Sequence, residues 1–350
     1  MKACYKKYIL DFKTPSGTSR GILRQKETWF LIVRDNDRSG IGECGLLKGL
    51  SVDDVPEYEA KLQWVCDHIQ EGKDWLWEQL SEFPSIQFGV EQLFLSLSAK
   101  DPFLLFPSDF TEKESPISIN GLVWMGKERF MHDQIQQKIA EGFGCIKMKI
   151  GAIDFETEYG LLEGIRSKYG AAEIELRVDA NGAFTPEDAI HKLERLSKLD
   201  IHSIEQPIKQ GQFDKMKLLC KETPLPIALD EELIGIFSIT EKESLLRRIR
   251  PQYIILKPSL VGGFKGSLEW IELVEKHGIS WWVTSALESN VGLSAIAQWT
   301  YTLKNKLPQG LGTGSLYTNN FESPLEVTDG AIWYRKSRQW EKNIISNLCI

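Results

Sequence analysis

The sequence lacks the features that would assign it to several large classes of protein. No stretch approaches 18 consecutive apolar residues, which argues against a membrane-spanning helix. Basic residues are not in excess: 42 Lys and Arg stand against 49 Asp and Glu, and the net charge of −7 disfavours nucleic acid or an anionic membrane as a partner. Residues 1–16 carry charges without an apolar core, so we expect no secretory signal and a cytoplasmic location.

Motifs for zinc and dinucleotide binding are also missing. The six cysteines form no C-x-x-C pair and the five histidines form no H-E-x-x-H, so we expect reduced thiols and no zinc site. The segment 310–314, GLGTG, has the composition of a dinucleotide-binding turn but not its G-x-G-x-x-G spacing.

What the chain does have is length, with 350 residues, and a change of pattern near residue 110. Residues 1–110 contain an apolar strand at 28–33, a glycine- and serine-bearing loop at 16–21, and helix-like segments near 52–70 and 86–100. Asp53 and Asp54 lie where acids favour the start of a helix. We predict a small α+β domain here, followed by a proline-bearing linker over 102–116.

From residue 115 short apolar strands alternate with amphipathic helices, which is typical of parallel sheets. Helices are expected near 127–141 and 264–277, and another begins at Thr185-Pro186, with threonine as the N-cap. Polar residues recur at the ends of the expected strands every 25 to 30 residues: Lys149, Asp179, Glu205, Asp230, Lys257, Ser285 and Gly312. Barrel enzymes place their sites at such strand ends, so this period favours an α/β barrel over a doubly wound sheet.

Three of these strand ends are acids: Asp179, Glu205 and Asp230. Carboxylates brought together repel one another unless a cation neutralises them, and a set of oxygen ligands suits Mg²⁺, with Mn²⁺ as a substitute. Glu231 follows Asp230 and is expected to orient a lysine, whereas Glu232 is expected at the surface.

Lysines accompany the acids. Lys147 and Lys149 share one face of a strand, and Lys257 ends a buried strand across the barrel. Lysines facing into a barrel need a negative site, and repulsion between them lowers the pKa of at least one toward that of a general base. The set predicts removal of a proton next to a metal-bound carboxylate.

The motifs Lys147-x-Lys149, Asp179-Ala180-Asn181, Glu205-Gln206-Pro207, Asp230-Glu231 and Lys257-Pro258 together resemble the muconate-lactonizing subgroup of the enolase superfamily. The resemblance covers nearly the whole chain. It implies an α/β fold with a (β/α)7β barrel over 115–318, and an α+β capping domain made by 1–110, to which 319–350 return. It also implies Mg²⁺ and lysine acid/base groups.

Within that subgroup, segments 285–292 (SALESNVG), 312–320 (GTGSLYTNN) and 17–21 (GTSRG) are most similar to the o-succinylbenzoate synthase family of menaquinone biosynthesis. This resemblance implies dehydration of 2-succinyl-6-hydroxy-2,4-cyclohexadiene-1-carboxylate to 2-succinylbenzoate. Lys149 would carry the proton beside Lys147, and Lys257 would stay protonated against the ring. Asn181 and Glu231 would support these groups. The expected substrate contacts are Arg177, Ser285, Ser289, Gly312, Thr313, Thr18 and Arg20.

Other functions stay open at this point. Relatives in the subgroup racemise N-succinyl amino acids through the same two lysines. Dipeptide epimerases usually carry Asp-x-Asp where this chain has Gly312-Thr313-Gly314, which disfavours them. A non-catalytic metal-binding barrel, or a lyase binding phosphate at the glycines of strand eight, would belong to a different class. The expected partner is a small carboxylate, and a homo-oligomer is compatible with the sequence.

Overall fold

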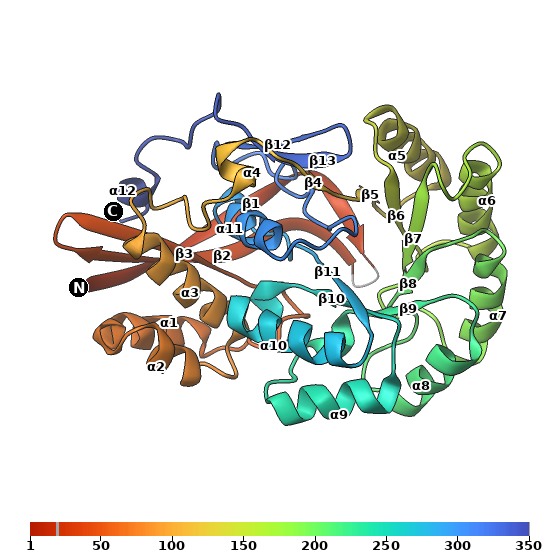
Figure 1. Cartoon of the computed structure of the whole chain (residues 1–350), viewed down its shortest axis with the longest axis horizontal. Coiled ribbons are helices and arrows are strands. Elements are labelled where there is room, and N and C mark those ends of the chain that lie inside the picture. The colour runs from red at the N-terminus through yellow and green to blue at the C-terminus, as the bar shows by residue number, and fades with distance from the viewer. Residues whose placement is uncertain (19–20, 350) are drawn as a thin grey trace.

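The N-terminal part of the chain forms an antiparallel sheet with helices packed on it (Figure 1). The computed structural model describes residues 1–18 and 21–349. The sheet has the order β1-β2-β3, and its buried face packs against α3. These elements, which we call the cap, are β1 (Lys2–Thr18), β2 (Gly21–Asp35), β3 (Arg38–Gly45), α1 (Tyr58–Asp67), α2 (Lys73–Glu78) and α3 (Pro84–Ser98).

Two glycines let the backbones of β3 and α3 touch. A Cβ atom added to Gly42 would lie 1.9 Å from the carbonyl oxygen of Gly89, so neither position has room for a side chain. The close contact brings α3 onto the inner face of the sheet, where Leu31, Val33 and Leu93 form part of a buried apolar core.

The predicted helix start at Asp53 and Asp54 is wrong, because α1 begins at Tyr58. The buried carboxylate of Asp53 instead accepts hydrogen bonds from the backbone N–H and the hydroxyl of Ser85, at 2.9 and 2.6 Å. Asp53 therefore holds the first turn of α3 rather than starting a helix of its own.

The second part of the chain is a curled parallel sheet surrounded by helices (Figure 1). Its seven strands run in the order β11-β10-β9-β8-β7-β6-β5, and bridges from Gln309 to Ile119 and from Gly310 to Thr284 close the ring. The predicted barrel fold is confirmed. The strands are β5 (Gly121–Val123), β6 (Cys145–Lys149), β7 (Glu175–Asp179), β8 (Ser203–Glu205), β9 (Ile227–Leu229), β10 (Tyr253–Leu256) and β11 (Ser280–Val283).

In the part of the chain that the structure describes, seven helices form the outer layer of the barrel, and their local signals agree with the sequence. Thr185 caps α7 by accepting from the N–H of Asp188 at 3.2 Å, with Pro186 in the first turn. The helices are α5 (Glu128–Ala140), α6 (Phe155–Arg166), α7 (Pro186–Ser197), α8 (Phe213–Glu222), α9 (Ile239–Ile249), α10 (Gly263–Lys276) and α11 (Asn290–Thr302). None of the helices in the described ranges is long and apolar enough to cross a membrane.

The C-terminal segment returns to the cap. The hydroxyl of Tyr8 donates to the carbonyl of Asn319 at 2.8 Å, and the side chain of Asn319 accepts from the N–H of Asp11 at 2.9 Å. Phe321 packs against Phe30 with ring centroids 5.5 Å apart. The boundaries predicted at 110, 115 and 318 stay predictions. The other α-helices and strands are α4 (Asp109–Glu112), β4 (Ile117–Ser118), β12 (Leu325–Thr328), β13 (Ala331–Tyr334) and α12 (Ile344–Leu348), with β12, β13 and β4 forming a small antiparallel sheet.

Candidate active site

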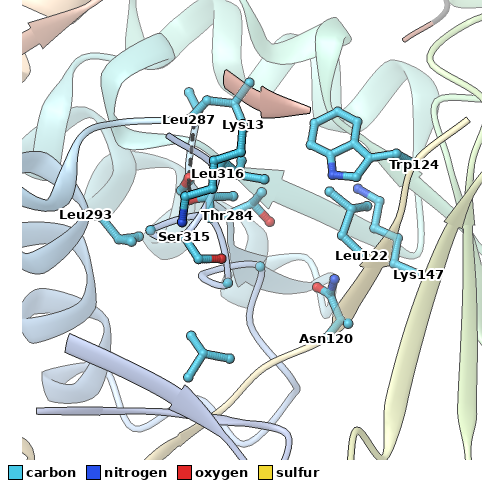
Figure 2. Close-up of a pocket in the computed structure, with 18 of the residues that line it drawn as sticks. Lys13, Asn120, Leu122, Trp124, Lys147, Thr284, Leu287, Leu293, Ser315 and Leu316 are labelled. Carbon is cyan, nitrogen blue, oxygen red and sulfur yellow. Dashed lines mark hydrogen bonds between the residues drawn. The ribbon is translucent and has the colours of Figure 1, made fainter. Parts of the chain in front are cut away.

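A cavity of about 1210 Å³ opens at the C-terminal ends of the barrel strands, between the barrel and the cap. Its barrel side is lined by Lys147, Lys149 and Lys257, whose side chains are largely buried. Its cap side includes Lys13, and Figure 2 shows Lys13 and Lys147 bordering the same space. The volume suits a small carboxylate rather than a macromolecule.

The two lysines of β6 contact the acids at the ends of β7 and β8. The Nζ atoms of Lys147 and Lys149 each lie 2.9 Å from Oδ2 of Asp179, and Lys147 also forms an ion pair with Glu205. Lys149 donates a second hydrogen bond, 2.7 Å long, to Oδ1 of Asn181. Alternation along β6 therefore brings both ammonium groups to one face, as the sequence predicts.

Lys257 reaches the same acids from the other side. It follows β10, forms an ion pair with Asp230, and has its Nζ 3.9 Å from Oε1 of Glu205. Because β7, β8 and β9 lie between β6 and β10 in the sheet, the two lysine groups face each other across the carboxylates.

Burial and charge act against each other in this network. Burial alone would raise the pKa of Asp179, but the ammonium group of Lys147 holds that pKa well below its usual range. Burial, followed by the charge of Asp179, raises the pKa of Glu205 well above its ordinary value. Burial would lower the pKa of Lys257, but Asp230 and Glu205 raise it. The negative charge of Glu205 is thus compensated less well than that of Asp179.

The predicted metal ligands lie together, although lysines now occupy the space between them. Over residues 1–18 and 21–349, no group of three His, Cys, Asp or Glu side chains is arranged to hold a metal ion. Yet Oε1 of Glu205 is buried and accepts no hydrogen bond from the described residues. An acceptor in this state, beside two further carboxylates at neighbouring strand ends, fits a divalent cation that prefers oxygen ligands.

Three polar side chains around the acids hold them in place. Asn181 connects Lys149 to Glu231, because its Nδ2 donates to Oε1 of Glu231 at 3.0 Å. Gln206 is a residue whose role the sequence did not indicate: its Oε1 accepts from the N–H of Asp230 at 3.2 Å. Glu232 is buried against Gln206 at 2.9 Å, so the expected surface position was wrong.

The predicted substrate contacts separate into two groups. Ser285, Gly312 and Thr313 line the cavity, and the hydroxyls of Ser285 and Thr313 lie 2.6 Å apart. Ser289 lies outside the lining, because its hydroxyl donates to Glu43 at 2.5 Å and caps α11. The structure therefore assigns Ser289 to the contact between cap and barrel instead of to the substrate.

Arg177 also lies outside the cavity lining. Its guanidinium donates to Glu175 at 2.7 Å and to the carbonyl of Pro308 at 2.9 Å, and it lies 4.2 Å from the ring centre of Trp282. These partners correct the predicted substrate contact, since residue 177 points inward one layer below Asp179. The prediction for Arg20 falls outside the described residues, as does that for the Thr18 side chain.

Comparison with known proteins agrees with this geometry. Residues 131–337 match the family model described as enolase C-terminal domain-like. The o-succinylbenzoate synthase of Desulfotalea psychrophila is 45% identical over 95% of this chain and 98% of its own length. The chain belongs to the o-succinylbenzoate synthase family of the enolase superfamily.

Solved structures extend the comparison for this o-succinylbenzoate synthase family member. MenC from Desulfotalea psychrophila has a TM-score of 0.84 and 41% identity, covering 95% of this chain and 99% of that one. Muconate lactonizing enzyme from Pseudomonas fluorescens has a TM-score of 0.82 over 99% and 98% of the two chains, and at 19% identity it shares the fold. The L-Ala-D/L-Glu epimerase of Bacillus subtilis is 25% identical over 65% of this chain and 59% of its own length.

Proposed function

We propose that this chain is a magnesium-dependent o-succinylbenzoate synthase, a hydro-lyase that converts 2-succinyl-6-hydroxy-2,4-cyclohexadiene-1-carboxylate to 2-succinylbenzoate and water. The observation that carries the proposal is the pair of opposed lysines, Lys149 and Lys257, at one set of carboxylates inside the cavity. The near full-length similarity to an o-succinylbenzoate synthase supports the choice of reaction.

Lys149 is the proposed proton carrier. It takes the proton from the carbon next to the ring carboxylate and returns a proton to the departing hydroxyl group, so that water leaves and the ring becomes aromatic. Lys147 is held by two acids, Asp179 and Glu205, whereas Lys149 shares only Asp179 and lies beside Asn181. This difference supports Lys149 rather than Lys147 in the role.

Lys257 is proposed to stay protonated on the far side of the ring, where its charge stabilises the electron-rich transition state. Asp179, Glu205 and Asp230 are the proposed ligands of Mg²⁺, which when bound would neutralise the charge that develops on the substrate carboxylate. The six cysteines are all unpaired, as is common in reducing compartments, and this supports a cytoplasmic location.

The test is to offer the purified protein three substrates with Mg²⁺: the cyclohexadiene, an N-succinyl amino acid and a dipeptide, the last two in deuterated water. We expect fast formation of 2-succinylbenzoate, slower exchange or racemisation of the N-succinyl amino acid, and little reaction of the dipeptide. No acid lies in the segment 312–314 to hold an amino group. Efficient dipeptide epimerisation without 2-succinylbenzoate would overturn the substrate assignment, and no reaction at all would favour a non-catalytic barrel.

A further inference from the structure

The first barrel strand, β5, forms a wall of the cavity to which neither the sequence motifs nor the proposed mechanism assigns a role. Leu122 in β5 and the residues that flank the strand, Asn120 and Trp124, are spaced two apart and all line the cavity. Leu122 is the register partner of Lys147, so this wall runs beside the lysine strand. Figure 2 shows the three side chains with Lys147 on one side of the space and Thr284 and Ser315 on the other.

Asn120 is a buried polar side chain aimed into this space. It is 6% exposed, and its backbone N–H donates to the carbonyl oxygen of Gln309 at 2.9 Å. Among the described residues, its carboxamide makes no hydrogen bond, and Figure 2 shows the amide turned toward the cavity. Because this amide faces the cavity and the described residues give it no partner, a ligand with a polar atom at this position can hydrogen-bond to it.

Gly312 lines the cavity close to Asn120. A Cβ atom added to Gly312 would lie 3.3 Å from the Ile119 side chain and 3.8 Å from the backbone carbonyl oxygen of Asn120, so a larger residue here would crowd both. The paired hydroxyls of Ser285 and Thr313, the residue after Gly312, also line the cavity. The Asn120 carboxamide and these two hydroxyls therefore give the cavity polar groups that can bind the oxygen atoms of a ligand.

Trp124 lies at the other end of the wall, close to the proposed base. The Nζ atom of Lys149 is 5.9 Å from the centre of its ring. Gln134 fixes the backbone of Trp124 from α5, accepting from its N–H at 2.9 Å and donating to its carbonyl at 3.0 Å. An indole held beside the reacting group provides a flat surface for a planar ring.

We propose that β5 recognises the substrate at two points. Trp124 packs against the ring that loses the proton, and the Asn120 carboxamide donates a hydrogen bond to an oxygen of the succinyl arm. This inference rests on the proposed function and names the contacts that select the substrate within it.

The test compares inhibition by two ligands that differ in the arm: 2-succinylbenzoate and 2-butylbenzoate, whose arm has no oxygen. Asn120→Leu should weaken the binding of 2-succinylbenzoate about 10-fold or more, because losing a hydrogen bond to a polar or charged oxygen lowers affinity by about that factor. The same substitution should change the inhibition constant of 2-butylbenzoate by less than about twofold. In turnover assays it should raise KM more than it lowers kcat. Trp124→Ala should weaken the binding of both ligands and leave the ratio of their inhibition constants unchanged.

Asn120→Asp is a second variant with almost no change in volume. Its negative charge should weaken the binding of 2-succinylbenzoate more than Asn120→Leu does. Asn305→Leu is the matched control: Asn305 donates to the Trp281 carbonyl at 2.6 Å outside the cavity lining, so its loss should lower the melting temperature without changing the ligand ratio.

If Asn120→Leu weakens the binding of both ligands equally, or of neither, this proposal is wrong. Turnover of the substrate by the wild-type protein would still support the proposed function. A wild-type protein that neither forms nor binds 2-succinylbenzoate would overturn both.

Discussion

Lys149 and Lys257 have the same charge but different surroundings. Lys149 is hydrogen-bonded to Asp179 and to the neutral amide of Asn181, whereas Lys257 is paired with Asp230 and lies near Glu205. Lys149 therefore faces one carboxylate and a neutral amide, whereas Lys257 faces two carboxylates. The two side chains are therefore suited to different steps.

Replacing Lys149 with alanine should lower kcat by about 10² to 10⁴ or more, because the proton then has no carrier. Single-turnover assays should find that bound substrate keeps its proton. Lys242→Ala is the control. This buried lysine lies outside the cavity lining and forms an ion pair with Glu269, with 2.6 Å between Nζ and Oε2, so its loss should reduce stability and leave kcat unchanged. Normal turnover by Lys149→Ala, with an inactive Lys147→Ala, would reverse the roles on β6.

Removal of divalent metal should abolish turnover, and added Mg²⁺ should restore it. Glu205→Gln should weaken Mg²⁺ binding measured by calorimetry while the circular dichroism spectrum stays unchanged, since Glu205 carries the buried acceptor without a hydrogen bond. Glu241→Gln, at the exposed cap of α9, should leave the binding isotherm as it is. Full activity in excess chelator would contradict the metal assignment.

At the scale of elements, a buried carboxylate, Glu43, ties the cap to the loop before α11. Glu43 in β3 is fully buried and accepts from the N–H and hydroxyl of Ser289 at 2.9 and 2.5 Å and from the N–H of Gly292 at 2.8 Å. The loop before Ser289 contains Leu287 in the left-handed region, with φ of +62°. A leucine in that conformation is strained and needs its surroundings to hold it.

Glu43→Gln should raise KM about tenfold with a smaller effect on kcat, because the amide cannot accept from all these donors and the loop lining the cavity shifts. Asp53→Asn is the matched control, since Asp53 is a buried cap carboxylate bonded only to Ser85 among the described side chains. Both variants should lose stability, and steady-state kinetics should separate them. An equal rise of KM in both would assign the effect to general loosening of the cap.

The strand-end acids and lysines could be predicted from sequence because a barrel repeats its strand ends at one period. Ser289 and Arg177 could not be assigned by the same logic. The partner of Ser289, Glu43, lies 246 residues away, and Pro308, which binds Arg177, lies 131 residues away. Asn120 was missed because a single amide before a short strand has no spacing signal; its role is indicated only by the cavity that it faces.

At the scale of the whole molecule, Glu91 links the cap to the start of α10. Its carboxylate accepts from the N–H of Lys265 at 3.0 Å and of Phe264 at 2.5 Å. Burial raises the pKa of Glu91 to about 7, although these hydrogen bonds and the charges of Lys73 and Lys265 oppose the rise.

The unfolded chain should release this proton near pH 4.5 and the folded chain near 7. Between those values the folded state binds more protons, so the free energy of unfolding should fall as pH rises, by on the order of 3 kcal/mol, and level off above about pH 7. Denaturant titrations should detect this slope, and Glu91→Gln should flatten it. If the free energy of unfolding of Glu91→Gln depends on pH as in the wild type, the dependence comes from other groups. Glu275→Gln, on the exposed side of α10, is the control and should keep the wild-type slope.

The hydrogen bond from Tyr8 to Asn319 joins residues 311 positions apart. A ribosome adding about 5–20 residues per second needs roughly 15 to 60 s to make that interval. The first strand of the cap is therefore synthesised long before the segment that covers it. During that time its exposed edge must be kept from pairing with other chains, so the nascent cap is where we expect molecular chaperones to bind.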